Sequence, residues 1–190
     1  MSIPQPIGPE EIVFSGKMLE VVHQKMDIGG TEVTFERARR APGVRLIIPS
    51  ADRESLLLTQ EHRSEIGGDD FRLPGGKVFD SLAEYKDALT SGADMKTAAH
   101  TAALKELAEE TGLTSQSLKL VSVSHAGATV EWDLYYYLVQ EFTEVSSGQS
   151  LEAGEEIEVL WLPKERVRDL CLHGDVKEDR SVAAILKYIG

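Results

Sequence analysis

Three glutamates near the middle of the chain have the residue type and the spacing that suit metal binding. Glu106, Glu109 and Glu110 lie in the stretch LKELAEETGLT, residues 104–114. On a helix, with 100° between successive residues, the three share one face. Each like-charged pair at helical spacing is destabilising by roughly 0.2–0.5 kcal/mol, and glutamates in the last turn oppose the helix dipole. A divalent cation would reverse both effects, and carboxylate oxygens suit Mg²⁺ or Mn²⁺.

The alternative is a solvated acidic face, because the chain as a whole is acidic, with a formal net charge of −12. Zinc is disfavoured, since no His/Cys pair stands at ligand spacing. The order of the surrounding segments favours the metal site. An extended segment ends in the turn Pro74-Gly75-Gly76, and a helix is predicted from Asp94, as N-cap, to Thr111, with Gly112 following it. The small residues Ala99 and Ala102 are expected to leave space above the carboxylates.

This order resembles the signature of the Nudix hydrolases, G-x5-E-x7-R-E-U-x-E-E-x-G-U, in which U is aliphatic. The matching positions are Gly76, Glu106, Leu107, Glu109, Glu110, Gly112 and Leu113. Lys105 replaces the family's arginine; it can reach Glu109 one turn on, but as a point charge rather than a bidentate fork. Gly76 and Lys105 are 29 positions apart where the motif has 14, so the chain carries 15 extra residues. Thr97 stands where the family has its first glutamate.

The inserted residues contain a predicted short helix at 81–89. It opens with Ser81-x-x-Glu84, the pattern of a capping box. Glu84 is an alternative source of the carboxylate that Thr97 does not supply.

The resemblance implies an enzyme that hydrolyses a nucleoside diphosphate linked to another group. Glu106, Glu109 and Glu110 are then metal ligands, and Gly76 contributes a backbone carbonyl to the metal. Glu110 is also a predicted catalytic residue. The implied cofactor is Mg²⁺, with Mn²⁺ as the other choice. Metal ions neutralise the charge of a phosphoanhydride and position the attacking water.

The resemblance also implies a general base outside the helix, on a loop after it. Glu156 is favoured, and Glu155 and Glu131 are the alternatives. Glu155 and Glu156 stand in EAGEEIEVLWLP, an acidic loop that leads into a strand and is similar to the corresponding part of the ADP-ribose and GDP-mannose hydrolases. The competing interpretation is that these two glutamates only keep the loop soluble.

Four arginines are expected to bind substrate. Arg37 and Arg39 alternate with Val33 and Phe35 on one face of a predicted strand. The other two are Arg63, in EHRSE, and Arg72, in FRLPGG. For each of them a surface ion pair is the alternative role. His125 and Tyr136 are weaker candidates, because a loop histidine and an alternating tyrosine are more often structural.

The predicted fold class is α/β, a Nudix-type α/β/α sandwich with a mixed sheet, plus an N-terminal antiparallel β-sheet subdomain. Residues 1–44 are assigned to that subdomain and residues 45–190 to the hydrolase domain. Residues 1–14 are expected to be irregular, and two strands meet at the Ile28-Gly29-Gly30 turn. Further strands are expected in VRLIIPS, SLLLTQEHR, LKLVSVS, EWDLYYYLVQEF and IEVLWLP, and two helices at 164–172 and 181–188.

The predicted function is Mg²⁺-dependent hydrolysis of nucleoside diphosphate sugars, such as ADP-ribose or GDP-mannose, by a homodimer formed through the N-terminal sheet. The alternatives are a dinucleoside polyphosphate or nucleoside triphosphate hydrolase, and a non-catalytic nucleotide-sugar sensor. A serine or cysteine hydrolase has little support, because there is no G-x-S-x-G. The acidity argues against nucleic acid as a partner, no apolar run is long enough for a membrane span, and the single Cys171 fits a cytoplasmic location.

Overall fold

The computed structural model describes residues 2–151 and 154–190, so residues 152–153 of the predicted acidic loop lie outside the described residues. The chain divides into two compact units. The first consists of Met1–Pro42, Phe79–Asp94 and His125–Asp133. The second consists of Gly43–Val78, Met95–Ser124 and Leu134–Gly190. Two segments of the first unit, Phe79–Asp94 and His125–Asp133, therefore lie well beyond residue 44 in the sequence.

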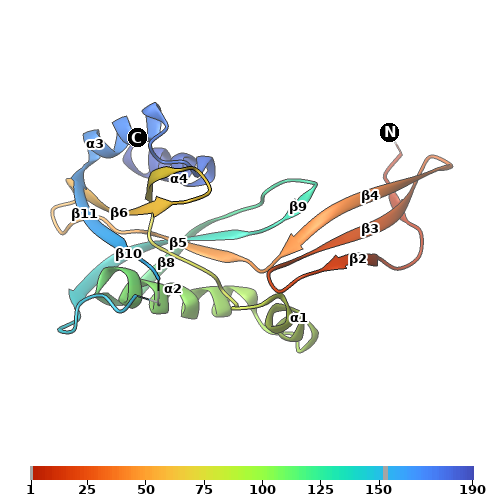
Figure 1. Cartoon of the computed structure of the whole chain (residues 1–190), viewed down its shortest axis with the longest axis horizontal. Helices are drawn as coiled ribbons and strands as arrows, with labels where there is room; N and C mark the ends of the chain where they lie inside the picture. The colour runs from red at the N-terminus through yellow and green to blue at the C-terminus, as the bar shows by residue number, and fades with distance from the viewer. Residues whose placement is uncertain (1, 152–153) are drawn as a thin grey trace. The chain divides into compact units, whose positions relative to one another are not determined.

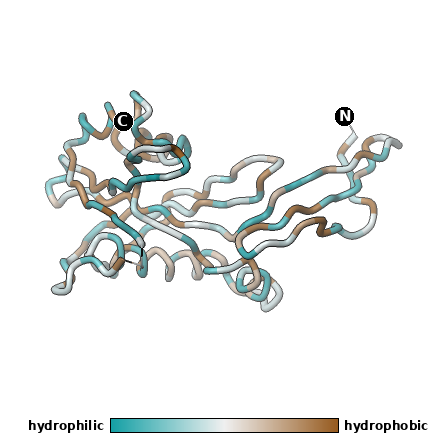
Figure 2. Tube along the Cα trace, viewed as in Figure 1, coloured by the Kyte–Doolittle hydropathy of each residue, from teal (hydrophilic) through white to brown (hydrophobic). Residues whose placement is uncertain are grey.

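The first unit is built around the predicted hairpin of β3 (Leu19–Ile28) and β4 (Thr31–Arg40). Gly29 and Gly30 join the strands, and both have positive φ, as a tight two-residue turn requires. Hydrophilic and hydrophobic residues interleave along this hairpin (Figure 2). A short strand, β9 (Val130–Glu131), pairs in parallel with β4. The hairpin prediction is confirmed.

The expectation of an irregular lead-in at residues 1–14 is wrong. The strands β1 (Gln5–Pro6) and β2 (Glu11–Ser15) both pair with β3 in antiparallel fashion. Prolines and glycine limit β1 to two residues, but the free edge of β3 offers backbone partners to whatever chain lies beside it. That edge is formed by residues later in the sequence, so local composition did not reveal the pairing.

The inserted helix is α1 (Leu82–Thr90), and it belongs to the first unit. Ser81 Oγ accepts a hydrogen bond from the Glu84 backbone N–H, at 3.2 Å. The Glu84 carboxylate accepts one from the Asp80 N–H, at 3.1 Å. The predicted cap is therefore present, and the Glu84 carboxylate takes part in it.

The second unit contains two three-stranded sheets between layers of helices (Figure 1). The mixed sheet has the order β5 (Gly43–Ile47), β10 (Leu134–Glu144), β8 (Leu113–Ser124), with β5 parallel and β8 antiparallel to β10. The antiparallel sheet has the order β11 (Ile157–Pro163), β6 (Ser55–Arg63), β7 (Gly68–Arg72). The helix α2 (Met95–Thr111) packs on β8, β5 and β10, and α3 (Lys164–His173) packs on β11, β6 and α4 (Asp179–Ile189). The α/β/α prediction is confirmed.

The core of the second unit lies between α2 and the strands. Val44, Leu46 and Leu57 are completely buried there. Ala99 and Ala102 belong to the same core, so the expectation that they leave space above the carboxylates is wrong. Their small size allows α2 to approach the sheet closely instead. In the described ranges, no helix is both long and apolar enough to span a membrane.

Candidate active site

The glutamates lie in the last two turns of α2, and the helix ends where the sequence predicts. Gly112 has a left-handed φ of 67°, and its N–H donates to the Ala108 carbonyl at 3.1 Å. A Cβ on Gly112 would lie 2.9 Å from the Gly148 carbonyl carbon, so a side chain does not fit. The chain turns here from α2 into β8 and leaves the glutamates at the end of the helix.

The glycine turn after β7 approaches two of these glutamates closely. The Gly75 N–H donates to Glu110 Oε2 at 2.7 Å. A Cβ on Gly76 would lie 2.5 Å from Cδ of Glu106 and closer still to one of its oxygens. The edge of β5 holds the turn, because the Val44 N–H donates to the Gly76 carbonyl at 2.9 Å. The turn and the helix therefore meet through Glu106 and Glu110.

Glu110 is in an unfavourable electrostatic environment. Burial raises its pKa to about 8, although the hydrogen bond from Gly75 acts in the opposite direction. The Glu106 carboxylate raises this pKa further by charge repulsion, and the Arg45 guanidinium lowers it. A buried carboxylate beside a second carboxylate is stabilised by a cation placed between them.

The oxygens at this point fit a hard divalent cation. Glu106 and Glu110 supply carboxylate oxygens, and the Gly76 carbonyl keeps one lone pair beyond its bond to Val44. Mg²⁺ commonly takes one or two carboxylates and keeps several waters. Glu109 instead pairs with Lys105 at 3.4 Å, which confirms that Lys105 can reach it. Within the described residues, no three acidic, histidine or cysteine side chains already lie together as a metal site, so the ligand assignment stays a prediction.

An open cleft of about 730 Å³ adjoins the helix end. It lies between β6, β7, β11 and the loop before β11. The acidic residues that line it are Glu61, Asp69, Glu155, Glu156 and Glu158. Gln149, also in the lining, donates from Nε2 to the Glu110 carbonyl at 2.6 Å. The Glu155 charge also raises the pKa of Glu110, by less than burial and Glu106 do. The cleft and the glutamate helix are therefore electrostatically coupled.

The three candidate bases lie in different surroundings. Glu155 and Glu156 line the cleft, on the loop before β11. Glu131 lies in the first unit, where its carboxylate accepts hydrogen bonds from Arg37 and Arg39. A carboxylate that accepts from two guanidinium groups holds a proton less readily than one without them.

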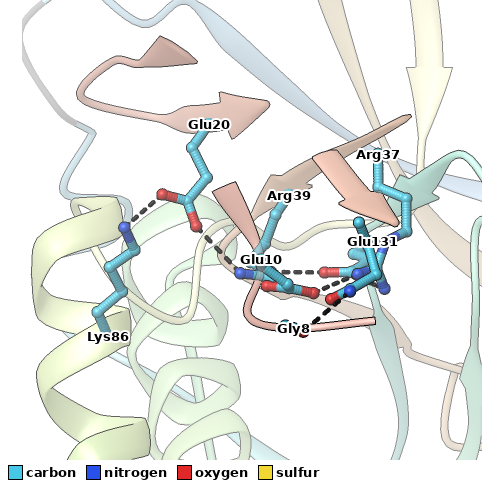
Figure 3. Close-up of polar contacts among 8 residues, drawn as sticks. Gly8, Glu10, Glu20, Arg37, Arg39, Lys86 and Glu131 are labelled. Atoms are coloured by element: carbon cyan, nitrogen blue, oxygen red, sulfur yellow. Dashed lines mark hydrogen bonds and ion pairs between the residues drawn. The ribbon is translucent and has the colours of Figure 1, made fainter. Parts of the chain in front are cut away.

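Arg37 and Arg39 share an ion-pair network, which Figure 3 shows. Both donate to Glu10 as well as to Glu131, with Arg39 Nη2 at 2.7 Å from Glu10. Arg39 also reaches Glu20, at 3.2 Å, a fully buried carboxylate that pairs in turn with Lys86 of α1. The network ties the inserted helix to the N-terminal sheet within the first unit.

Arg63 and Arg72 lie in the second unit and are also paired. Arg63 lies 3.0 Å from Glu61, and Arg72 lies 3.2 Å from Asp70. Since Glu61 lines the cleft, Arg63 reaches its edge. All four predicted arginines therefore have carboxylate partners, and their roles in binding substrate stay predictions.

The two weaker candidates also have structural partners. His125 Nδ1 lies 2.6 Å from Asp133 in the first unit. Tyr136 is buried in the second, where its hydroxyl lies 3.3 Å from Ser181 Oγ. Both placements fit structural roles.

The sequence reasoning missed three residues around the glutamates: Arg45, Gln149 and Glu178. Arg45 carried a signal that could have been used, because it interrupts the apolar run VRLIIP. A charge within a buried strand requires a partner, although the sequence does not say which. Gln149 and Glu178 carried no such signal.

The family description "NUDIX domain" matches residues 39–184, more than half of the chain. The chain belongs to the Nudix family. The match confirms the resemblance of this Nudix hydrolase to the family, which was drawn from Gly76 and the helix glutamates.

Relatives and a solved structure match nearly the whole chain. A CMP-5'-(N-acetyl-N-hydroxy-3-aminopropyl)phosphonate hydrolase from Streptomyces rubellomurinus is 26% identical over 95% of this chain and 80% of its own length. An ADP-ribose pyrophosphatase from Bacillus subtilis is 20% identical over 97% of this chain and 92% of its own. The crystal structure of an ADP compounds hydrolase matches with a TM-score of 0.71, at 20% identity, over 96% of this chain and 90% of that one. The last likeness shows the fold.

Proposed function

We propose that this Nudix hydrolase is a Mg²⁺-dependent pyrophosphohydrolase that cleaves nucleoside diphosphate sugars to a nucleoside monophosphate and a sugar phosphate. The observation that carries the proposal is the acidic cleft, whose lining residue Gln149 donates a hydrogen bond to the backbone carbonyl of Glu110. A pyrophosphate group would be repelled by these carboxylates unless cations lay between them. The names of the relatives, an ADP-ribose pyrophosphatase and a CMP-phosphonate hydrolase, support a nucleotide-linked substrate.

The helix end supplies the metal ligands in this proposal. Glu106, Glu109 and Glu110, with the Gly76 carbonyl, would hold the cation. When bound, such a cation neutralises phosphate charge and makes its bound water more acidic. The Gly75 N–H orients the Glu110 carboxylate, and the close approach of Gly76 restricts that of Glu106.

The cleft supplies the proton acceptor. Hydrolysis joins a water oxygen to phosphorus and breaks the bond to the bridging oxygen, so the water must lose a proton. Glu156 is the preferred acceptor, with Glu155 beside it, because both line the cleft. Glu131 is less suited, since two arginines stabilise its charged form.

Arginines complete the substrate contacts in the proposal. Arg63 lies beside the cleft through Glu61, and Arg72 follows on β7. Arg37 and Arg39 belong to the first unit, and their part in binding substrate rests on the family resemblance; a guanidinium fork that holds a carboxylate is equally suited to a phosphate.

We further propose a homodimer formed through the N-terminal sheet. Large hydrophobic side chains are exposed on β2 and β4, among them Phe14 at 55% and Phe35 at 40%. Light scattering at micromolar concentration should show a dimer, and Phe35→Glu should shift it toward monomer. A wild-type monomer would contradict this part of the proposal. A cytoplasmic location, in keeping with the free buried thiol of Cys171, is also part of it.

A substrate panel tests the main proposal. ADP-ribose, GDP-mannose, a CMP-linked phosphonate, a dinucleoside polyphosphate and nucleoside triphosphates would each be incubated with Mg²⁺, and phosphate measured after coupled phosphatase. We expect turnover of a nucleotide-sugar that needs both Mg²⁺ and the phosphatase. Turnover of triphosphates or dinucleoside polyphosphates alone would favour the first alternative. Binding of a nucleotide-sugar without turnover would favour the sensor.

The phosphonate relative justifies a second candidate substrate. It is 26% identical to this chain, and its name places CMP and a phosphonate in the molecule it hydrolyses. If the CMP-linked phosphonate is turned over at least tenfold more efficiently than any sugar, the substrate class in the proposal must change while the site does not.

A further inference from the structure

Arg45 is a buried cation in the middle of β5, between the apolar residues Val44 and Leu46. Its side chain is only 7% exposed. Burying a guanidinium is unfavourable unless each part of it is paired. The partners of Arg45 therefore indicate what this residue does, and they come from two places: Glu178 at the start of α4, and backbone carbonyls of β5 and the glycine turn.

On one side Arg45 meets Glu178 with both arms of its fork. Nε lies 2.8 Å from Oε2 and Nη2 lies 3.2 Å from Oε1. Ser181 Oγ donates to the same carboxylate at 2.6 Å and lies 3.3 Å from the Tyr136 hydroxyl. Burial opposes ionisation of Glu178, but Arg45, Ser181 and Arg180 together outweigh it and lower the pKa of this carboxyl. The start of α4 thus holds a charged, oriented anchor for the guanidinium.

On the other side Arg45 reaches the glycine turn. Its Nη1 donates to the Val44 carbonyl at 2.9 Å and to the Gly75 carbonyl at 3.4 Å. Gly75 has a φ of 141°, a conformation that L side chains rarely adopt. Its N–H, on the preceding peptide, donates to Glu110. Hydrogen bonds therefore connect Glu178 through Arg45 and Gly75 to a predicted metal ligand.

We propose that Arg45, anchored by Glu178, is a positioning residue that fixes the Gly75 turn and so orients the Glu110 carboxylate and the Gly76 carbonyl. This inference rests on the proposed function, which makes Glu110 and Gly76 metal ligands. It gives the C-terminal segment a role in the site, because Glu178 holds the guanidinium and Ser181 in turn donates to the Glu178 carboxylate. Backbone bonds from Leu46 to the Pro74 carbonyl, at 2.8 Å, and from Val44 to the Gly76 carbonyl, at 2.9 Å, hold the peptides on either side. The guanidinium holds the peptide between them through the Gly75 carbonyl.

Arg45→Lys is the first test, because lysine keeps the charge but reaches Glu178 and Gly75 with one ammonium group rather than a fork. Exchange of the Gly75 amide proton, followed by NMR, should accelerate about tenfold, since its bond to Glu110 opens more often. With a substrate from the panel, kcat should fall on the order of tenfold to 100-fold while KM stays within about twofold. Calorimetry should show weaker Mn²⁺ binding without substrate.

Arg180→Lys is the matched control. Arg180 also lies near the Glu178 carboxylate, with its Nη2 at 4.0 Å from Oε1, and the substitution again replaces an arginine with a lysine. We expect wild-type kcat and wild-type Gly75 exchange in this variant. Equal losses in Arg180→Lys and Arg45→Lys would show a general disturbance around Glu178 and would overturn the assignment.

The double variant Arg45→Met/Glu178→Met guards against misfolding, because it removes both charges and leaves neither unpaired. It should melt as a folded protein, and it should show the same faster Gly75 exchange and lower kcat. Wild-type Gly75 exchange in either Arg45 variant would overturn the positioning role, whatever the activity. If the wild type turns over no substrate, the proposed function fails, but the exchange measurement still decides whether Arg45 holds the turn.

Discussion

The substitution Gly76→Ala should disable the site while leaving the fold intact. Gly76 does not occupy the left-handed region, so alanine can adopt its backbone conformation without strain. The three atoms nearest to an added Cβ belong to the Glu106 carboxylate, the far end of a flexible side chain. The change therefore displaces a predicted metal ligand and little else.

The size of the displacement follows from the contact distances. A Cβ on Gly76 would lie 2.5 Å from Cδ of Glu106, and ordinary van der Waals contact begins near 3.4 Å. The carboxyl carbon must then move by about 0.9 Å. A misplacement near 1 Å at a catalytic centre lowers the rate by on the order of 100-fold, which is about 2.7 kcal/mol of transition-state stabilisation.

Gly75→Ala is the matched comparison, because it alters the same turn in a different way. Gly75 has a φ of 141°, and its Cβ would lie 2.9 Å from the Val44 carbonyl carbon, a backbone atom that cannot move aside. We expect Gly75→Ala to lower the melting temperature and Gly76→Ala to leave it within a few degrees.

The assay is steady-state phosphate release with the preferred nucleotide-sugar and saturating Mg²⁺, beside thermal melts followed by circular dichroism. For Gly76→Ala we expect kcat to fall on the order of 100-fold at an unchanged melting temperature. If the variant kept wild-type kcat, Glu106 would not be a metal ligand held against the turn. A melting temperature that fell as far as in Gly75→Ala would show instead that alanine disturbs the fold.

Three more predictions concern other carboxylates. Glu110→Gln should abolish Mg²⁺-dependent turnover without lowering the melting temperature, because burial already raises the pKa of this group to about 8 and so disfavours its charge; wild-type turnover would remove it from the ligands. Glu156→Gln should lower kcat at least tenfold with KM little changed, whereas Glu131→Gln should lose less kcat; the reverse order would make Glu131 the base. Glu10→Gln should lower the melting temperature at pH 7, because a hydrogen bond from Arg39, with the charges of both network arginines, lowers the pKa of Glu10 below its ordinary 4.5 against the effect of burial. That stabilisation is present above pH 4.5 and is lost as pH falls through the lower folded-state pKa, so the difference in melting temperature should shrink in acid; a constant difference would contradict the pKa direction.

Local patterns were sufficient for most elements of the fold. The hairpin of β3 and β4 depends on two adjacent glycines, and α1 on a cap within four residues. The end of α2 depends on Gly112, so the glutamates could be placed at a helix terminus in advance. These features follow from interactions between near neighbours along the chain. The strands β1 and β2 could not be found in this way, because their backbone partner is the edge of β3.

By itself, the sequence determined the α/β class, the glutamate helix, the glycine turn before it and membership of the Nudix family. Only the tertiary structure decided which charges meet. Arg45 and Glu178 are 133 positions apart, and Arg37 and Glu131 are 94 apart. Periodicity and capping act over one or two turns, whereas the partner of a buried charge is set by how distant strands and helices pack. The arginine within VRLIIP therefore indicates from the sequence that an anionic partner is needed, and only the fold shows that this partner is Glu178.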